Sequence, residues 1–138
     1  MKITVRAVGK IRPPFSEAEA HYLKMLRSKQ SLEVVEAKDD AALIRRIDRE
    51  SHLVALDIGG EEMTSEGWAA WLDRRRRAGR KVEILIGGPE GLPAAERQAA
   101  QEKLALGPQT MAHQLARVVL LEQIFRASKI LARENYHL

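Results

Sequence analysis

The chain has 138 residues, of which 45% are hydrophobic and 30% charged, and its net charge is +4 at pH 7. These values favour a single folded domain over residues 1–138 and exclude a largely disordered chain. No apolar run is long enough to cross a bilayer, and the lack of cysteine excludes disulfides and thiolate metal sites, so we expect a cytoplasmic protein without a membrane anchor. The positive charge favours a polyanionic partner, whereas an aromatic content of 4% argues against binding by stacking on many bases.

The first half of the chain alternates between strand and helix patterns. Residues 2–8 alternate apolar and polar side chains, which predicts a strand, and a loop follows. Ser16 and Glu19 have the spacing of a capping box, which predicts a helix from Ser16 to about residue 28. The next predicted elements are a strand over 32–37, a helix capped by Asp39 or Asp40, and a strand over 53–57.

The second half continues this alternation. Thr64 or Ser65 predicts a helix start, and Gly79 predicts the end of that helix. A short apolar run over 82–86 is typical of a strand buried on both faces of a parallel sheet. The remaining predicted elements are a helix over 93–103, a strand over 104–106 and a long helix over 114–134. Strict alternation predicts an α/β fold with a mostly parallel sheet of five to six strands and helices on both faces.

The loop after the 82–86 strand is the first place to expect a ligand. Residues 87–91 read Gly-Gly-Pro-Glu-Gly, so the backbone can turn sharply and approach a ligand without interference from Cβ atoms. Ligands of open α/β sheets bind beyond the carboxyl ends of the strands. An ordinary strand-to-helix turn would use similar residues, so this motif alone leaves both interpretations open.

Three segments together match a known family. They are Leu-Asp-Ile-Gly-Gly at 56–60, Ile-Gly-Gly-Pro-Glu-Gly-Leu at 86–92, and a segment from Thr-Met-Ala-His-Gln at 110–114 through residues 117–118 and 122–127 to the terminal Tyr-His at 136–137. In order, spacing and total length the chain resembles the RlmH family, the ribosomal large-subunit pseudouridine N3-methyltransferases of the SPOUT superfamily. It departs from the common pattern at Ala112, where many members have proline.

The resemblance implies a SPOUT-type α/β knot, in which the C-terminal part of the chain forms a trefoil knot that general topology rules would discard. It also implies S-adenosylmethionine in the knot, between the loops that follow the third, fourth and fifth strands. Carried over by position, the implied cofactor-binding residues are Leu56, Gly87, Leu106, Gly107, Pro108, Gln109, Thr110 and Met111. Apolar walls and free peptide groups at these positions suit an adenine ring.

The implied reaction transfers a methyl group to N3 of a pseudouridine in 23S rRNA, within the assembled ribosome. Because N3 carries a weakly acidic proton, a positioned base or a stabilising field would assist the transfer. The candidates are His113, Arg117, Tyr136 and His137. Each also has a plainer interpretation: His113 as a packing or capping residue, Arg117 as a surface arginine or a phosphate contact, and Tyr136 with His137 as a frayed terminus. SPOUT enzymes are homodimers, so we expect the C-terminal tail to complete the partner's site.

Other interpretations remain open on the residues alone. The basic run over 74–81 is either an RNA contact or a solvated helix end. A flavodoxin-type nucleotide-binding domain would share the element order, although no glycine loop of the phosphate-binding type follows the first strand. A non-catalytic ribosome-binding or assembly factor would share the fold. No histidines and carboxylates have metal-ligand spacing, so no metal is expected.

Overall fold

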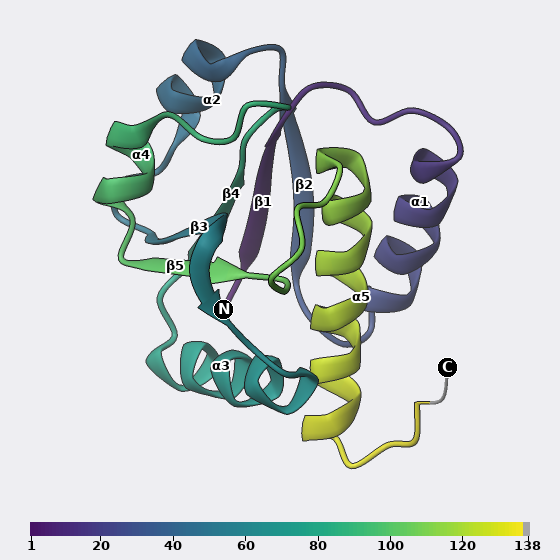
Figure 1. The fold of residues 1–138 in the computed structure, drawn as a ribbon. Helices are drawn as coiled ribbons and strands as arrows, with labels where there is room; N and C mark the ends of the chain where they lie inside the picture. Colours follow the sequence, from purple (N-terminus) through teal and green to yellow (C-terminus); the bar gives the residue numbers. More distant parts are fainter. Residues whose placement is uncertain (137–138) are drawn as a thin grey trace.

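The computed structural model describes residues 1–136, in which five strands alternate with five helices along the chain (Figure 1). The elements are β1 (Ile3–Val8), α1 (Phe15–Leu26), β2 (Leu32–Ala37), α2 (Asp40–Arg46), β3 (His52–Glu62), α3 (Ser65–Ala78), β4 (Val82–Ile86), α4 (Ala94–Ala99), β5 (Glu102–Ala105) and α5 (His113–Leu131). The predicted order of strands and helices is confirmed.

The strands form one sheet in the order β2-β1-β4-β3-β5, and every pair is parallel. The apolar run of β4 lies in the middle: Ile84 is opposite Val5 on one side and Val54 on the other. All five residues of β4 are buried, as expected for a strand covered on both faces. The prediction of a parallel α/β sheet in which the 82–86 strand is buried on both faces is therefore confirmed.

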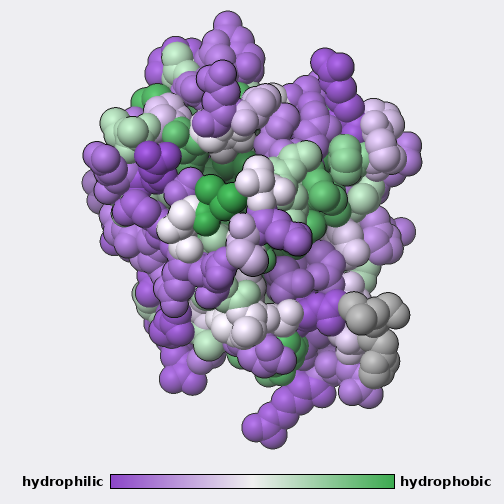
Figure 2. Space-filling view, in the orientation of Figure 1, coloured by the Kyte–Doolittle hydropathy of each residue, from purple (hydrophilic) through white to green (hydrophobic). Residues whose placement is uncertain are grey.

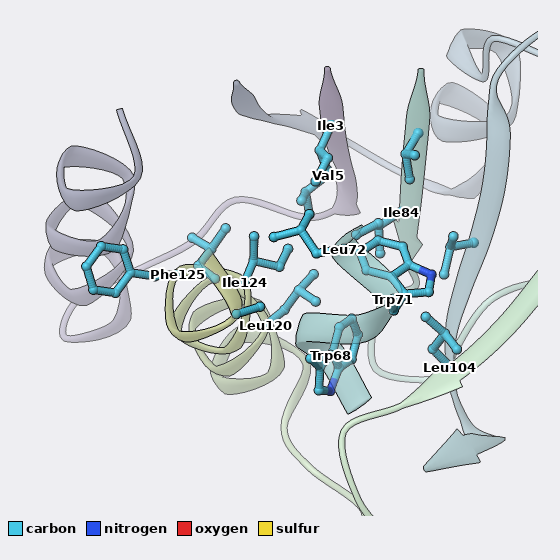
Figure 3. Close-up of a cluster of buried hydrophobic side chains, with 14 of the residues drawn as sticks. Ile3, Val5, Trp68, Trp71, Leu72, Ile84, Leu104, Leu120, Ile124 and Phe125 are labelled. Carbon is cyan, nitrogen blue, oxygen red and sulfur yellow. The ribbon is translucent and has the colours of Figure 1, made fainter. Parts of the chain in front are cut away.

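Helices cover both faces of this sheet, and each face has its own hydrophobic core. Side chains of β1, β3 and β4 pack against α1, α3 and α5 on one face (Figure 3). On the opposite face, Leu85 of β4 packs with residues of α2 and the segments around α4. The larger core contains Trp68 and Trp71, fully buried and packed edge to face with ring centroids 5.5 Å apart. Burying one such ring removes about 150–250 Å² from water, which stabilises the fold by up to about 4–6 kcal/mol.

Local capping residues were predicted correctly at three helix ends. Thr64 accepts a hydrogen bond from the N–H of Gly67 at 3.0 Å, and Asp39 accepts one from the N–H of Ala42 at 2.8 Å. Gly79 closes α3 with a φ of 76°, a left-handed conformation that favours glycine. These ends depend on neighbours in sequence, which explains why the pattern suffices to find them.

The capping box predicted at Ser16 and Glu19 is wrong. The helix α1 begins at Phe15, and no side chain caps its first turn. Glu19 is buried and forms a two-pronged hydrogen bond with Arg117, with distances of 3.0 and 3.1 Å. The Glu19 carboxylate therefore pairs with Arg117 of the distant helix α5 instead of capping the first turn of α1.

The boundaries around β5 also differ from the prediction. The helix α4 ends at Ala99 rather than at 103, because the main chain of Gln101 donates to the carbonyl of Leu53 at 2.9 Å and its side chain accepts from the Leu53 N–H at 2.6 Å. These bonds start β5 at Glu102, two residues before the predicted position.

The strand β3 is longer than the predicted 53–57 segment, since it runs to Glu62. Leu56 and Glu61 both pair with Leu104, so residues 57–60 form an irregularity between two paired stretches. A Cβ on Gly60 would come within 2.6–2.8 Å of the backbone of β5, which requires glycine there. The last helix, α5, spans His113–Leu131 instead of 114–134. Within residues 1–136, no helix is both long and apolar enough to span a membrane.

Candidate active site

Three segments that are distant in sequence enclose one cavity of about 670 Å³ at the carboxyl ends of β3, β4 and β5. They are the end of the regular part of β3, the loop after β4, and the segment from the end of β5 into α5. Figure 2 shows apolar surface gathered between β4 and the first turns of α5, with hydrophilic surface around it. The lining residues are Leu56, Asp57, Ile58, Ile86, Gly87, Gly88, Pro89, Glu90, Gly91, Arg97, Ala105, Leu106, Gly107, Gln109, Thr110, Met111, Ala112, His113 and Ala116.

The loop after β4 is shaped by its glycines. A Cβ on Gly87 would lie 2.3 Å from the backbone carbon of Gly91, closer than real side chains come. Gly91 has a φ of 81°, and its N–H donates to the carbonyl of Gly88 at 2.9 Å. The glycine at 87 is therefore required by the loop's contact with its own backbone, and the same fold-back forms one wall of the cavity.

Gly107 is different, because the protein's own packing does not require it. Its φ is not positive, and a Cβ added there would meet no atom within 4 Å. The residue lines the cavity, so a side chain at this position would occupy open space beside it. A ligand in the cavity would need the space that a side chain at position 107 would fill, whereas the protein's own contacts do not require glycine there.

The cavity combines apolar walls with a few charged groups at the ends of the same segments. Leu56, Leu106 and Met111 provide half-buried apolar surface. Asp57 and Glu90 place negative side chains on the lining, and Arg97 places a positive one. Such a mixture suits a ligand with a flat apolar ring and charged ends, since the walls bury the ring and the charged groups fix the orientation.

Most of the predicted site residues converge on this cavity. The structure brings together Leu56, Gly87, Leu106, Gly107, Gln109, Thr110, Met111 and His113. Pro108 belongs to the same segment but does not line the cavity. His113 is half-buried, is the first residue of α5 and lines the cavity, so the helix fixes its backbone at the edge of the cavity.

Arg117 does not reach the cavity lining, and the interpretation of this residue as a surface arginine is wrong. It is 1% exposed and pairs with Glu19 and with Glu36, in each case at 2.9 Å. It also donates to the carbonyl of Gly9 at 3.2 Å. Burial raises the pKa of Glu19, while the Arg117 guanidinium acts in the opposite direction. The side chain joins β2, α1 and the loop after β1.

Tyr136 lies at the other end of α5 from the cavity (Figure 1). Its ring packs edge to face on Phe125 at 5.0 Å, and the guanidinium of Arg126 lies 4.5 Å from the ring centre. Twelve residues separate His113 from Phe125, which is about 18 Å along a helix. Tyr136 and His113 are therefore not neighbours within one chain. His137 lies outside the described residues.

The basic run at the end of α3 is largely occupied by structural contacts, which supports its interpretation as a helix end. Arg76 donates to the side chain of Gln30 and to the carbonyl of Lys29, each at 2.9 Å. Arg80 donates to two backbone carbonyls, and Lys81 pairs with Asp48 at 2.8 Å. This run also leads into the amino end of β4, whereas the cavity is at the carboxyl end.

Several lining residues were missed by sequence reasoning. Asp57 and Ile58 follow the apolar part of β3 directly, so the rule that ligands bind at carboxyl ends could have found them. Arg97 comes from α4, and Ala116 from the second turn of α5, and no local pattern points to either. In the part of the chain that the structure describes, no three His, Asp or Glu residues are grouped as metal ligands.

Comparison with known proteins agrees with this geometry. Residues 1–137 match the family described as "Predicted SPOUT methyltransferase". The ribosomal RNA large subunit methyltransferase H of Ruminiclostridium cellulolyticum is 36% identical, with 99% of each chain aligned, and that of Nitratidesulfovibrio vulgaris is 38% identical, with 98% of this chain and 97% of the relative aligned.

Solved structures share the fold at low sequence identity. A probable methyltransferase from Bordetella pertussis superposes with a TM-score of 0.58 at 13% identity, covering 92% of this chain and 96% of that one. A probable methylase family protein from Haemophilus influenzae gives 0.59 at 14% identity, covering 99% and 72%. With a parallel sheet, a cavity at its carboxyl edge and full-length relatives, the chain belongs to the SPOUT methyltransferase family, together with the ribosomal RNA large subunit methyltransferases H.

Proposed function

We propose that this protein uses S-adenosylmethionine to methylate N3 of a pseudouridine in 23S rRNA of the assembled ribosome, and that it acts in the cytoplasm. The observation that carries the proposal is the convergence of three chain segments on one cavity at the sheet's carboxyl edge. Relatives that align over nearly the whole chain are named for the methylation of large-subunit ribosomal RNA.

The cavity suits S-adenosylmethionine in size and in the chemistry of its lining. Its volume of about 670 Å³ falls within the range of small-molecule sites, about 300–1,000 Å³. Leu56, Leu106 and Met111 would pack on the adenine, and the open space beside Gly107 would admit the ligand. The bound cofactor would supply an activated methyl group on a sulfonium. Asp57 and Glu90 on the lining would favour the cationic end of such a molecule.

We assign to His113 the role of the general base that accepts the proton from N3 of the pseudouridine. His113 lines the cavity, and a neutral imidazole can take the proton that leaves N3. The start of α5 holds the backbone of His113, so little reorganisation is needed to orient the ring. Arg117 would act on the reaction only through its neighbours, because it is buried beneath the loop after β1.

The homodimer and the role of the tail are also part of the proposal. Tyr136 packs on Phe125, which lies about 18 Å along α5 from His113, so Tyr136 and His113 can share a site only if the tail reaches the cavity of a second subunit. Burial, with a contribution from the nearby Glu122 carboxylate, raises the pKa of Tyr136 to about 12, so the phenol stays protonated and can donate a hydrogen bond. A mixed dimer of a Gly107→Ala subunit and a subunit truncated after residue 134 should recover activity that neither homodimer has. Recovery in no mixture would contradict the role of the tail.

The experiment that tests the proposed function is mass-spectrometric mapping of rRNA from cells with and without the gene. We expect one N3-methylated pseudouridine to be lost from 23S rRNA when the gene is absent. An unchanged profile would overturn the proposed substrate. Calorimetry with S-adenosylmethionine then separates the alternatives, because a non-catalytic assembly factor has no need to bind it and a flavodoxin-type domain would bind a flavin instead.

A further inference from the structure

The loop between β1 and α1 is held in place by side chains in addition to backbone bonds, in which the Gly9 N–H donates to the carbonyl of Ala37 at 2.7 Å and the Ser16 N–H to that of Arg12 at 3.0 Å. Gln114 contacts it twice: its Oε1 accepts from the N–H of Arg12 at 3.0 Å, and its Nε2 donates to the carbonyl of Lys10 at 3.2 Å. Both amide functions of Gln114 are therefore used to fix two alternate residues of the loop. Gln114 itself is absent from the cavity lining.

The buried ion network below the loop completes this attachment. Arg117 donates to the carbonyl of Gly9 at 3.2 Å, and the carboxylate of Glu36 accepts from the N–H of Ile11 at 2.7 Å. Arg117 and Glu36 are themselves paired at 2.9 Å. As a result, each residue from 9 to 12 has a backbone group bonded to a side chain of β2 or α5. A short exposed loop with this many long-range bonds is held in one conformation.

This loop lies beside the mouth of the cavity. Val8, the last residue of β1, has its Cγ1 3.4 Å from the position that a Cβ on Gly88 would take. Gln114 directly follows His113, and both Gly88 and His113 line the cavity. The loop therefore adjoins the cavity from the loop after β4 on one side and from the start of α5 on the other.

The loop carries two cationic side chains directed to solvent. Lys10 and Arg12 are both exposed, and among residues 1–136 neither side chain has a salt bridge or hydrogen bond. The basic run at the end of α3 is larger, but Arg76, Arg80 and Lys81 are bonded to protein groups, and the run leads into the amino end of β4, opposite the cavity. Besides Arg97, which lines the cavity itself, Lys10 and Arg12 are thus the exposed cations that this loop places beside the cavity mouth, whereas the dense run leads into the opposite edge of the sheet.

We propose that the β1–α1 loop is a fixed phosphate-binding rim, in which Lys10 and Arg12 contact RNA phosphates next to the target nucleotide. Gln114 and Arg117 are positioning residues that hold these cations in register with the cavity. The inference rests on the proposed RNA substrate. Because the loop is already ordered, the two cations bind phosphates without the entropy loss of ordering the backbone.

The expected size of the effect follows from counterion release. Each phosphate contact contributes about 0.7–0.9 to the slope of log K against log salt, which is about a five- to eightfold gain in affinity at about 0.1 M salt. Removing both cations with Lys10→Gln/Arg12→Gln should therefore weaken ribosome binding about 25- to 60-fold and reduce the slope by about 1.4–1.8.

The test uses the full chain and ribosomes purified from cells that lack the gene. Lys10→Gln/Arg12→Gln is compared with Arg27→Gln/Arg74→Gln, which removes two exposed arginines at the amino ends of the strands. The first variant should raise KM for ribosomes, leave kcat within about twofold, and leave the affinity for S-adenosylmethionine unchanged. The control should leave all three unchanged. Equal KM values and salt slopes for the two variants would overturn the inference.

Gln114→Ala tests the positioning role separately from any effect on folding. On its own it should raise KM for ribosomes without changing kcat, and no more strongly than the loss of both cations. Added to Lys10→Gln/Arg12→Gln it should change nothing further, because it acts only through those cations. An additive effect would show that Gln114 contacts the RNA or the cavity itself and would overturn its positioning role.

The proposed function and the phosphate-binding rim can be refuted by different results. If the wild-type protein neither binds S-adenosylmethionine nor methylates these ribosomes, the proposed function is wrong, and the inference falls with it. If the wild-type protein is active but the loop variants match the control, only the phosphate-binding rim is wrong.

Discussion

Removing the guanidinium of Arg117 while Glu19 stays in place should destabilise the fold by about 3–5 kcal/mol. In the native protein Arg117 donates to both carboxylate oxygens of Glu19, and the two residues are 1% and 8% exposed. Arg117→Met keeps a long side chain but leaves a buried carboxylate without its main partner. The loss is larger than for a surface pair, because water cannot replace the missing guanidinium.

This loss converts into a measurable shift in melting temperature. At about 2.1 cal/mol/K per residue, the unfolding entropy of 138 residues is about 290 cal/mol/K, so 1 kcal/mol shifts Tm by about 3.4 °C. Arg117→Met should therefore lower Tm by about 10–17 °C. The matched control is the double variant Glu19→Leu/Arg117→Met, which removes both charges and should recover most of the loss.

The decrease in Tm caused by Arg117→Met should also depend on pH. Burial raises the pKa of Glu19 above its ordinary range, and Arg117 opposes this, so the pKa rises further when Arg117 is removed. A carboxyl with a raised folded-state pKa stabilises the fold fully below its unfolded pKa and loses that contribution as pH rises through the folded value. Thermal melts between about pH 5 and about pH 8 should show the smallest deficit at the acid end. A deficit that is the same at every pH, or a double variant as unstable as the single one, would refute this reasoning.

Three further predictions concern the cavity and the core. Gly87→Ala should lower Tm in thermal melts, because the added methyl would lie 2.3 Å from the loop's own backbone. Gly107→Ala should leave Tm unchanged but weaken the binding of S-adenosylmethionine measured by calorimetry. His113→Ala should reduce single-turnover methyl transfer about 10²- to 10⁴-fold, and unchanged rates would exclude it as the base. Burial alone would raise the pKa of Glu102, but hydrogen bonds, including one from Trp71, outweigh this and lower the pKa. The Glu102 carboxylate therefore stabilises the fold at pH values above the ordinary carboxyl pKa range, and this stabilisation is lost as pH falls through the lowered pKa. The decrease in Tm caused by Glu102→Gln should thus become smaller on acidification. A decrease that is the same at every pH would contradict this.

Features set by neighbours in sequence could be predicted, and these include most of the fold. The buried run of β4 and the caps at Asp39, Thr64 and Gly79 depend on local patterns, and the structure confirms them. The extension of β3 to Glu62 could not be predicted in this way, since it depends on pairing with β5 across an irregular segment. The trefoil knot stays a prediction, because strand order and register do not define how the loops cross.

The candidate site could be predicted only in part, for the same physical reason. Leu56 is at the end of the regular part of β3 and Gly87 directly follows β4, so their place at the carboxyl edge follows from the strand pattern. The burial of Arg117 could not be predicted, because its partner Glu19 lies 98 positions away and has the spacing of a helix cap. Local periodicity cannot identify a partner at that distance, and a buried ion pair leaves no signal in either segment alone.

The most direct test of the central claim is methyl transfer from S-adenosylmethionine with a deuterated methyl group to ribosomes that lack the modification. The wild-type protein should place one deuterated methyl on N3 of a pseudouridine in 23S rRNA, and His113→Ala should do so far more slowly. Deuterated methyl at any other atom, or no transfer by a wild-type protein that binds the cofactor, would contradict this claim.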